Sequence, residues 1–214
     1  MLIVNDDPFG KFGLGVKRLW RRGAVPLVIG ACCFAFALGG EAARDWGSYD
    51  RAGLANGQVW RLITAHLVHL GWAHLWPNLL ALILIGGLLE EFLSRVEWTV
   101  ASLVTGFAIS TGLYLFQPET HWYVGLSGVL HGLVACGAVM MIRARAVGLG
   151  VGLGLGLTLK LLWEVIYGPV PLTAASVGGA VVVAAHLYGA IAGALAGLAF
   201  AAMRWRTVPE TARL

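Results

Sequence analysis

Long apolar runs constrain this chain more than any other feature of its sequence. A window of about 19 residues finds runs that are each long enough to cross a bilayer as a helix, with every backbone polar group paired inside the segment. Hydrophobic residues make up 58% of the chain and charged residues only 12%, which excludes an ordinary soluble domain. The sequence therefore predicts an all-α membrane protein with six transmembrane helices. These helices are expected at about 24–41, 74–93, 98–116, 126–142, 147–167 and 177–203.

Basic residues predict how these helices are oriented. Of the 15 lysines and arginines, 11 flank the expected spans on one side, three lie on the other side, and Lys160 lies within a span. Because Lys and Arg are enriched in cytoplasmic loops, both termini are expected in the cytoplasm. The expected parts are a basic N-terminus at 1–23, a membrane domain at 24–203 and a C-terminal tail at 204–214. This arrangement accounts for the net charge of +4 without a nucleic-acid partner.

The first noncytoplasmic loop, at about 42–73, mixes aromatic and basic residues. Such residues anchor a chain at the headgroup level of a bilayer. We therefore expect this loop to be ordered and semi-embedded in the membrane. The expected anchors are Trp46, Tyr49, Trp60, Arg61 and Trp72.

A glycine-rich tract, Gly148–Leu157, begins the fifth expected span. Its glycines at 148, 152 and 156 share one helical face, and those at 150 and 154 lie roughly opposite. Small residues allow helix backbones to approach closely in a membrane. The tract favours close packing on neighbouring helices over a role as a moving gate.

Ser127 is a candidate nucleophile because polar side chains inside spans are costly and mark functional sites. It lies between Gly125 and Gly128, which permit a sharp turn and the close approach of another backbone. A serine in this position can also hydrogen-bond to a nearby carbonyl without any catalytic role.

His186 is the candidate base for Ser127. Gly189 and Gly193 follow it on the same helical face and would let another helix dock beside the imidazole. Counted from residue 177, His186 would lie roughly 13 Å inside the sixth span, near Ser127 if the preceding loop dips into the membrane. A neutral imidazole within hydrogen-bond reach activates a serine hydroxyl. His131 follows Ser127 by one helical turn and is the local alternative.

His74 and Asn78 lie on one face at the start of the second span, where Pro77 is tolerated in the first helical turn. Their neutral donors, with the Ser127 backbone amide, could stabilise the oxyanion of a tetrahedral intermediate. A metal site is the competing interpretation, since His66 and His69 lie nearby. No carboxylate or cysteine joins these histidines at ligand spacing, so we expect neither a metal nor a cofactor.

Together these motifs resemble the rhomboid intramembrane serine proteases, and they occur in that family's order over all six expected spans. The matching residues are Trp60-Arg61, His69, His74 and Asn78, Gly86, Gly87 and Glu90, Gly125, Ser127 and Gly128, and His186, Gly189 and Gly193. The resemblance implies a Ser127/His186 dyad with no third acid and an oxyanion hole from His74, Asn78 and the Ser127 amide. It also implies a water-filled cavity open to the noncytoplasmic face, a fifth span beside the path of substrate entry, and a structural role for Glu90.

Four stretches, "WRLITAHLVHLGWAHL", "VGLSGVLHG", "KLLWE" and "AHLYG", are similar to the rhombosortase branch of bacterial rhomboids. That branch is associated with exported proteins that end in a GlyGly motif, a transmembrane helix and a basic tail. The resemblance implies an enzyme of the bacterial inner membrane whose site opens to the periplasmic or external side. It implies cleavage near the GlyGly, with the acyl group passing to water or to an amine.

Two departures from the broader rhomboid pattern concern residues near the expected dyad. His131 stands where many rhomboids have a tyrosine, and we expect it to orient His186 rather than only to satisfy a backbone carbonyl. Lys160 and Glu164 are one turn apart in the fifth span and are expected to neutralise one another. The sharper hypothesis is that Glu164 holds the GlyGly segment or positions an incoming amine.

Three alternatives remain beside the rhombosortase-type enzyme. A general rhomboid protease would cleave other membrane substrates, and a noncatalytic relative would bind membrane helices without cutting them. The Ser127, His186 and oxyanion residues argue against the noncatalytic protein. A transporter is disfavoured because the spans show neither a charged pathway nor an obvious inverted repeat.

Overall fold

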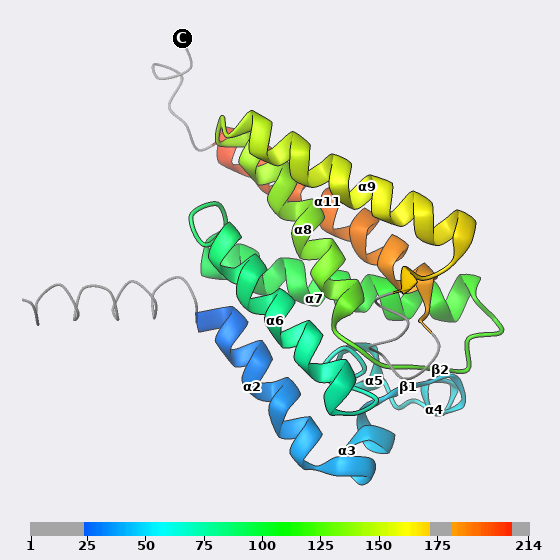
Figure 1. The fold of residues 1–214 in the computed structure, drawn as a ribbon. Coiled ribbons are helices and arrows are strands. Elements are labelled where there is room, and N and C mark those ends of the chain that lie inside the picture. The colour runs from blue at the N-terminus through cyan, green and yellow to red at the C-terminus, as the bar shows by residue number, and fades with distance from the viewer. Residues whose placement is uncertain (1–23, 172–180, 207–214) are drawn as a thin grey trace, which may run out of the picture.

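The computed structural model describes residues 24–171 and 181–206, and its main elements are helices (Figure 1). Two short strands, β1 (Tyr49–Asp50) and β2 (Trp122–Tyr123), pair antiparallel, with Tyr49 opposite Tyr123. The predicted all-α class is thereby confirmed. In chain order the described helices are α2 (Ala24–Leu38), α3 (Gly40–Gly47), α4 (Arg51–Ala55), α5 (Arg61–Thr64), α6 (Trp72–Leu89), α7 (Arg95–Phe116), α8 (Ser127–Arg143), α9 (Val147–Tyr167) and α11 (Val183–Arg206).

Four of the described helices, α6, α7, α9 and α11, are long and apolar enough to cross a membrane. Helices α2 and α3 make a fifth candidate if they count as one span, although the chain bends by 120° between them. Helix α8 is a shorter apolar helix of 17 residues. All six expected runs thus contain an apolar helix, but the described residues hold four or five candidate spans rather than six. The expected start of the last run, at 177, lies outside the described residues.

Helix α8 occupies the middle of the bundle, between α11 and α9 on one side and α6 on the other (Figure 1). Its contact with α11 is made backbone to backbone. A Cβ atom on Gly189 would collide with the Gly128 carbonyl oxygen, and one on Gly193 with the Gly132 carbonyl oxygen. Glycine at these positions lets the start of α11 lie directly against the start of α8.

The glycine-rich tract of α9 behaves differently from the expected close packing. Only Gly150 is tightly packed, since a Cβ there would lie 2.7 Å from the Ala138 carbonyl oxygen of α8. Cβ atoms on Gly148, Gly152 and Gly156 would meet nothing within 4 Å. The expectation of close packing is therefore wrong for this face. The reason is that α9 touches α8 through the opposite face, while Gly152 and Gly156 line a cavity.

The segment between α2 and α6 is ordered around the side chain of Arg61, which is only 8% exposed. Its Nη1 donates to the carbonyl oxygens of Asp45 (2.8 Å) and Ser48 (2.6 Å). Next to it, the Trp60 ring stacks on Trp46 at 5.7 Å between centroids. The predicted order of this loop is confirmed, but Tyr49 and Arg61 are buried inside the protein, so their expected role as headgroup anchors is wrong. Arg61 is buried because its guanidinium pairs with the loop's own carbonyl oxygens.

Candidate active site

Ser127 and His186 meet where α8 and α11 begin. The hydroxyl oxygen of Ser127 lies 2.9 Å from Nε2 of His186, within hydrogen-bond distance. Ser127 is the first residue of α8, and His186 is the fourth residue of α11. His186 thus lies in the first turn of its helix and not about ten residues inside it, as the sequence suggested, because the described helix starts at Val183.

Glycines bring these two residues together. Gly125 has φ +126°, a conformation that side chains rarely adopt, and its amide donates to the Ala65 carbonyl oxygen at 3.0 Å. This turn delivers Ser127 to the helix start. A Cβ on Gly128 would lie 2.9 Å from the Ala185 carbonyl oxygen, so the backbone just before His186 rests on this glycine.

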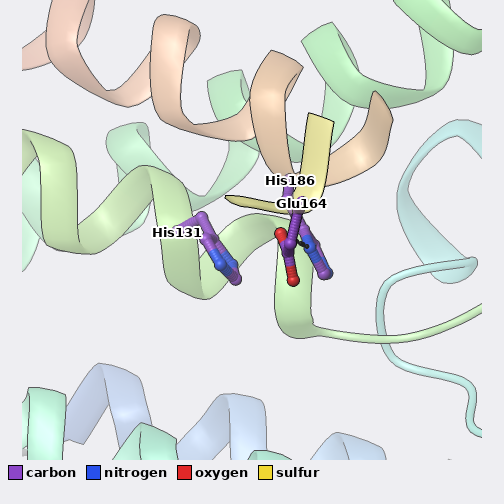
Figure 2. A group of neighbouring side chains, drawn as sticks. All are labelled: His131, Glu164 and His186. Atoms are coloured by element: carbon purple, nitrogen blue, oxygen red, sulfur yellow. Dashed lines mark hydrogen bonds and ion pairs between the residues drawn. The ribbon is translucent and has the colours of Figure 1, made fainter. Parts of the chain in front are cut away.

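The structure adds a carboxylate to this pair. Oε2 of Glu164, on α9, lies 2.8 Å from Nδ1 of His186. The other oxygen, Oε1, accepts a hydrogen bond from Nζ of Lys160 at 2.6 Å, so the predicted ion pair is present. Figure 2 shows the carboxylate of Glu164 beside the His186 ring.

This contact differs from the dyad without a third acid that the family resemblance implied. The sequence signal that could have suggested it is a carboxylate inside an apolar span, near the same end of the bundle as the expected start of the sixth span. The contact joins residues 22 positions apart on different helices, and their meeting depends on how α9 is rotated.

His131 makes two contacts in this cluster. Its ring stacks on that of His186, and its Nδ1 lies 2.7 Å from the Ser127 carbonyl oxygen. Because a carbonyl only accepts, Nδ1 of His131 carries a proton and donates it. His131 thus contacts the His186 ring and also satisfies a backbone carbonyl. The hydrogen bond to Ser127 goes to its backbone, whereas the hydroxyl pairs with His186.

His74 and Asn78 are both buried in α6 and line the same cavity as Ser127. Nδ1 of His74 accepts from the Leu70 amide at 3.4 Å, which leaves the ring proton on Nε2. A Cβ on Gly125 would lie 3.0 Å from that Nε2, so the imidazole donor faces the turn before Ser127. The amide nitrogen of Asn78 donates one of its two hydrogens to the His74 carbonyl oxygen at 2.9 Å.

The sequence predicted Pro77 in the first helical turn, and this is wrong because α6 begins five residues earlier, at Trp72. It therefore lies in the second turn. Its missing amide would otherwise serve the carbonyl of Ala73.

The histidines proposed for a metal site do not converge. Nε2 of His66 lies 2.8 Å from the Gly106 carbonyl oxygen and 3.0 Å from the Ser110 hydroxyl. The His69 ring packs edge-on against His74 at 4.9 Å between centroids. Burial lowers the pKa of His66 to about 4 and that of His69 to about 3, so both are neutral near pH 7. A neutral imidazole could still bind a metal, but among the described residues the ligand atoms of His66, His69 and His74 do not form a common group, so the structure does not support a metal site there.

Within the described ranges, one group of three potential metal ligands has its ligand atoms within 4.8 Å of one another, namely His131, Glu164 and His186. These side chains already pair with protein partners, namely Lys160 and the Ser127 hydroxyl and carbonyl groups. A hydrogen-bonded cluster accounts for the group as it stands.

The site opens into a cavity of about 520 Å³ between α6, α8 and α9. Its polar lining includes Ser127, His186, His74, Asn78, His131 and Lys160. Apolar side chains and the backbone of Gly152 and Gly156 make up much of the rest. Glu90, by contrast, caps the opposite end of α6 and has no place in this cluster.

Four described membrane-length helices and a cavity at which a serine hydroxyl lies within hydrogen-bond distance of an imidazole define a class, the multi-pass membrane proteins with a serine-histidine pair at an internal cavity. The rhomboid domain family matches residues 56–203, which is more than half of the chain. The chain therefore belongs to the rhomboid family, as the sequence motifs predicted.

Two curated relatives, both from Bacillus subtilis (strain 168), are similar to part of the chain. YdcA, named as a candidate rhomboid protease, is 33% identical over 99 residues, which are 46% of this chain and 50% of YdcA. The rhomboid protease GluP is 30% identical over 102 residues, which are 48% of this chain and 19% of GluP. The matched region thus spans about half the length of one relative and about a fifth of the other.

Proposed function

We propose that this chain is an intramembrane serine endopeptidase in which Ser127 is the nucleophile and His186 the general base. The observation that carries the proposal is the 2.9 Å contact between the Ser127 hydroxyl and His186 Nε2 in a cavity among membrane-length helices. A serine hydroxyl is a weak nucleophile until a neighbouring base takes its proton.

The proposed reaction has two halves. Ser127 Oγ bonds to the carbonyl carbon of the scissile peptide while His186 Nε2 takes the hydroxyl proton. His186 then gives that proton to the leaving amine, the C–N bond breaks, and an acyl-enzyme remains on Ser127. Water attacks the ester in the second half and restores the serine.

His74, Asn78 and the Ser127 amide are the proposed oxyanion donors. Support comes from the assigned Nε2 proton of His74, its position beside Gly125, and the second amide hydrogen of Asn78. Neutral donors that are already in place stabilise the developing negative charge without reorganisation during the reaction.

The narrower proposal is a rhombosortase-type enzyme of the bacterial inner membrane. Both termini are proposed to be cytoplasmic, and the site to open to the periplasmic or external side. The bundle end where α8 begins, at Ser127, also carries α3 to α5 and both strands (Figure 1), whereas Arg143 is the last residue of α8 and Arg145 follows it at the other end. This distribution agrees with the enrichment of basic residues on the cytoplasmic side.

The proposed substrates are exported proteins with a C-terminal GlyGly motif, a transmembrane helix and a basic tail. Cleavage near the GlyGly would release the protein from its membrane anchor, and an amine could replace water as the attacking group. The support is the four sequence stretches that resemble the rhombosortase branch, three of which contribute Ser127, Glu164 and His186 to one cluster. A general rhomboid protease with other membrane substrates is the second candidate, and it uses the same site.

Reconstituted protein and a reporter ending in GlyGly, an apolar helix and a basic tail would test the proposal. Wild type should cut the reporter and react with a fluorophosphonate probe at Ser127, whereas Ser127→Ala should do neither. A second reporter carries two leucines in place of the GlyGly. Cleavage of the GlyGly reporter alone supports the rhombosortase type. Cleavage of both reporters supports the general protease, and cleavage by Ser127→Ala would contradict either. Mass spectrometry of the new C-terminus separates a free carboxylate from an amine adduct.

A further inference from the structure

We infer that Glu164 is the third member of the proposed active site, a positioning residue that fixes the tautomer of His186, and that Lys160 fixes the orientation of Glu164. This inference rests on the proposed function. It differs from a serine-histidine dyad, and it also differs from a role for Glu164 in binding the substrate.

Hydrogen-bond roles at His186 follow from its two partners. An ionised carboxylate can only accept, so Nδ1 of His186 must carry the ring proton and donate it to Oε2 of Glu164. Nε2 then holds a lone pair, and the hydroxyl of Ser127 donates to it. This is the tautomer that a general base needs, because the other tautomer would direct a proton at the serine.

The carboxylate is held in place by packing as well as by charge. The Glu164 side chain is fully buried, whereas that of Lys160 is 33% exposed. One turn before Glu164, Leu161 packs with Ala135 of α8 and Ala190 of α11. This apolar contact sets the distance of α9 from both helices, so Glu164 approaches His186 with little freedom.

Lys160 keeps the buried carboxylate ionised and also defines which oxygen faces the histidine. A buried carboxylate without a partner would be strongly disfavoured. Nζ of Lys160 has three hydrogens to donate and accepts none, so it requires an acceptor at the Oε1 position. That requirement makes a specific prediction for an amide in place of the carboxylate.

In Glu164→Gln, the amide oxygen should turn to Lys160 and the NH₂ group should face Nδ1 of His186. Nδ1 would then have to accept, the ring proton would move to Nε2, and the base would be lost. If Lys160 is replaced by Met in the same chain, the amide is free to present its oxygen to Nδ1. The second substitution should therefore restore part of the activity that the first removes.

The test is the rate at which a fluorophosphonate labels Ser127 in reconstituted full-length protein. Glu164→Gln should label about 10²- to 10⁴-fold more slowly than wild type. The double variant Glu164→Gln, Lys160→Met should label at least about tenfold faster than Glu164→Gln alone. Glu164→Asp should also label faster than Glu164→Gln. Thr158→Val, on the exposed face of α9, is the matched control and should label normally.

Nitrogen NMR of histidine-labelled protein gives a second readout, because it reports which ring nitrogen of His186 carries the proton. Nδ1 should be protonated in wild type and in the double variant, and Nε2 in Glu164→Gln.

Labelling of Glu164→Gln within about threefold of wild type would overturn the inference. An unchanged His186 tautomer in that variant, or a double variant slower than Glu164→Gln, would do the same. These outcomes leave the proposed function intact as long as wild type is labelled and Ser127→Ala is not. Failure of the inference about Glu164 can therefore be distinguished from failure of the proposed function.

Discussion

The ring of His131 lies parallel to that of His186, with 4.2 Å between centroids and 10° between planes. It also donates a hydrogen bond to the Ser127 carbonyl oxygen. One side chain thus contacts both residues of the proposed nucleophile and base pair. An offset aromatic pair contributes about 0.5–1.5 kcal/mol beyond its buried area.

Replacement of His131 should separate stacking from hydrogen bonding. His131→Tyr keeps an aromatic ring at the stack, and we expect its peptidase rate to stay within about threefold of wild type. His131→Ala removes the ring and should slow the reaction roughly two- to tenfold, the range that the stacking energy corresponds to. The measurement is the initial rate of reporter cleavage. Complete loss in His131→Tyr, with His186 intact, would contradict this supporting role and reopen His131 as a candidate base for Ser127.

Loss of an oxyanion donor should lower the turnover number more than the Michaelis constant. Asn78→Ala removes an amide that faces the cavity, and His74→Ala removes the Nε2 donor beside Gly125. Each should reduce kcat by about a hundredfold to a thousandfold, because these interactions form mainly in the transition state.

The control for these variants is Asn56→Ala, an exposed position at the end of α4. It should cleave the reporter at the wild-type rate. Unchanged kcat in both Asn78→Ala and His74→Ala would contradict the assigned oxyanion site.

Gly189→Ala should destabilise the protein, because its methyl group would collide with the Gly128 carbonyl oxygen. Overpacking of this kind costs about 1–3 kcal/mol, and rigid backbone on both sides leaves little room to adjust. Gly148→Ala is the matched control, since a Cβ there meets nothing within 4 Å. Thermal unfolding in detergent should show a lower midpoint for Gly189→Ala and an equal or higher midpoint for Gly148→Ala. Equal midpoints for Gly189→Ala and wild type would show that α8 and α11 do not meet in this way.

His66 should make the fold sensitive to acid. Its pKa is lowered by burial from 6.5 to about 4, so between these values the unfolded chain binds a proton that the folded chain does not. The stability that this group contributes is therefore present above about pH 6.5 and is lost as the pH falls through about 4.

His66→Gln keeps a donor for the Gly106 carbonyl oxygen but cannot titrate. Its unfolding midpoint should fall less steeply than that of wild type between pH 7 and pH 5. Parallel curves for the two proteins would mean that His66 does not contribute to this pH dependence.

The sequence by itself determined the membrane class and the family. Both depend on order along the chain: the length of the apolar runs, and the spacing of motifs such as His74 with Asn78 and His186 with Gly189. The same information identified Ser127 and His186 as a pair, and in the structure the Ser127 hydroxyl oxygen lies 2.9 Å from Nε2 of His186. It did not locate the helix starts, so the depth of His186 and the turn occupied by Pro77 were both misjudged.

Only the tertiary structure decided which face of α9 packs on the bundle and which carboxylate reaches His186. Gly150 against Ala138, and Leu161 against Ala135 and Ala190, fix the rotation of α9 about its own axis. That rotation turns Glu164 to Nδ1 of His186 and leaves Gly152 and Gly156 on the cavity wall. An apolar helix with glycines on two faces has no strong hydrophobic preference for either in lipid, so close packing with its neighbours selects the orientation.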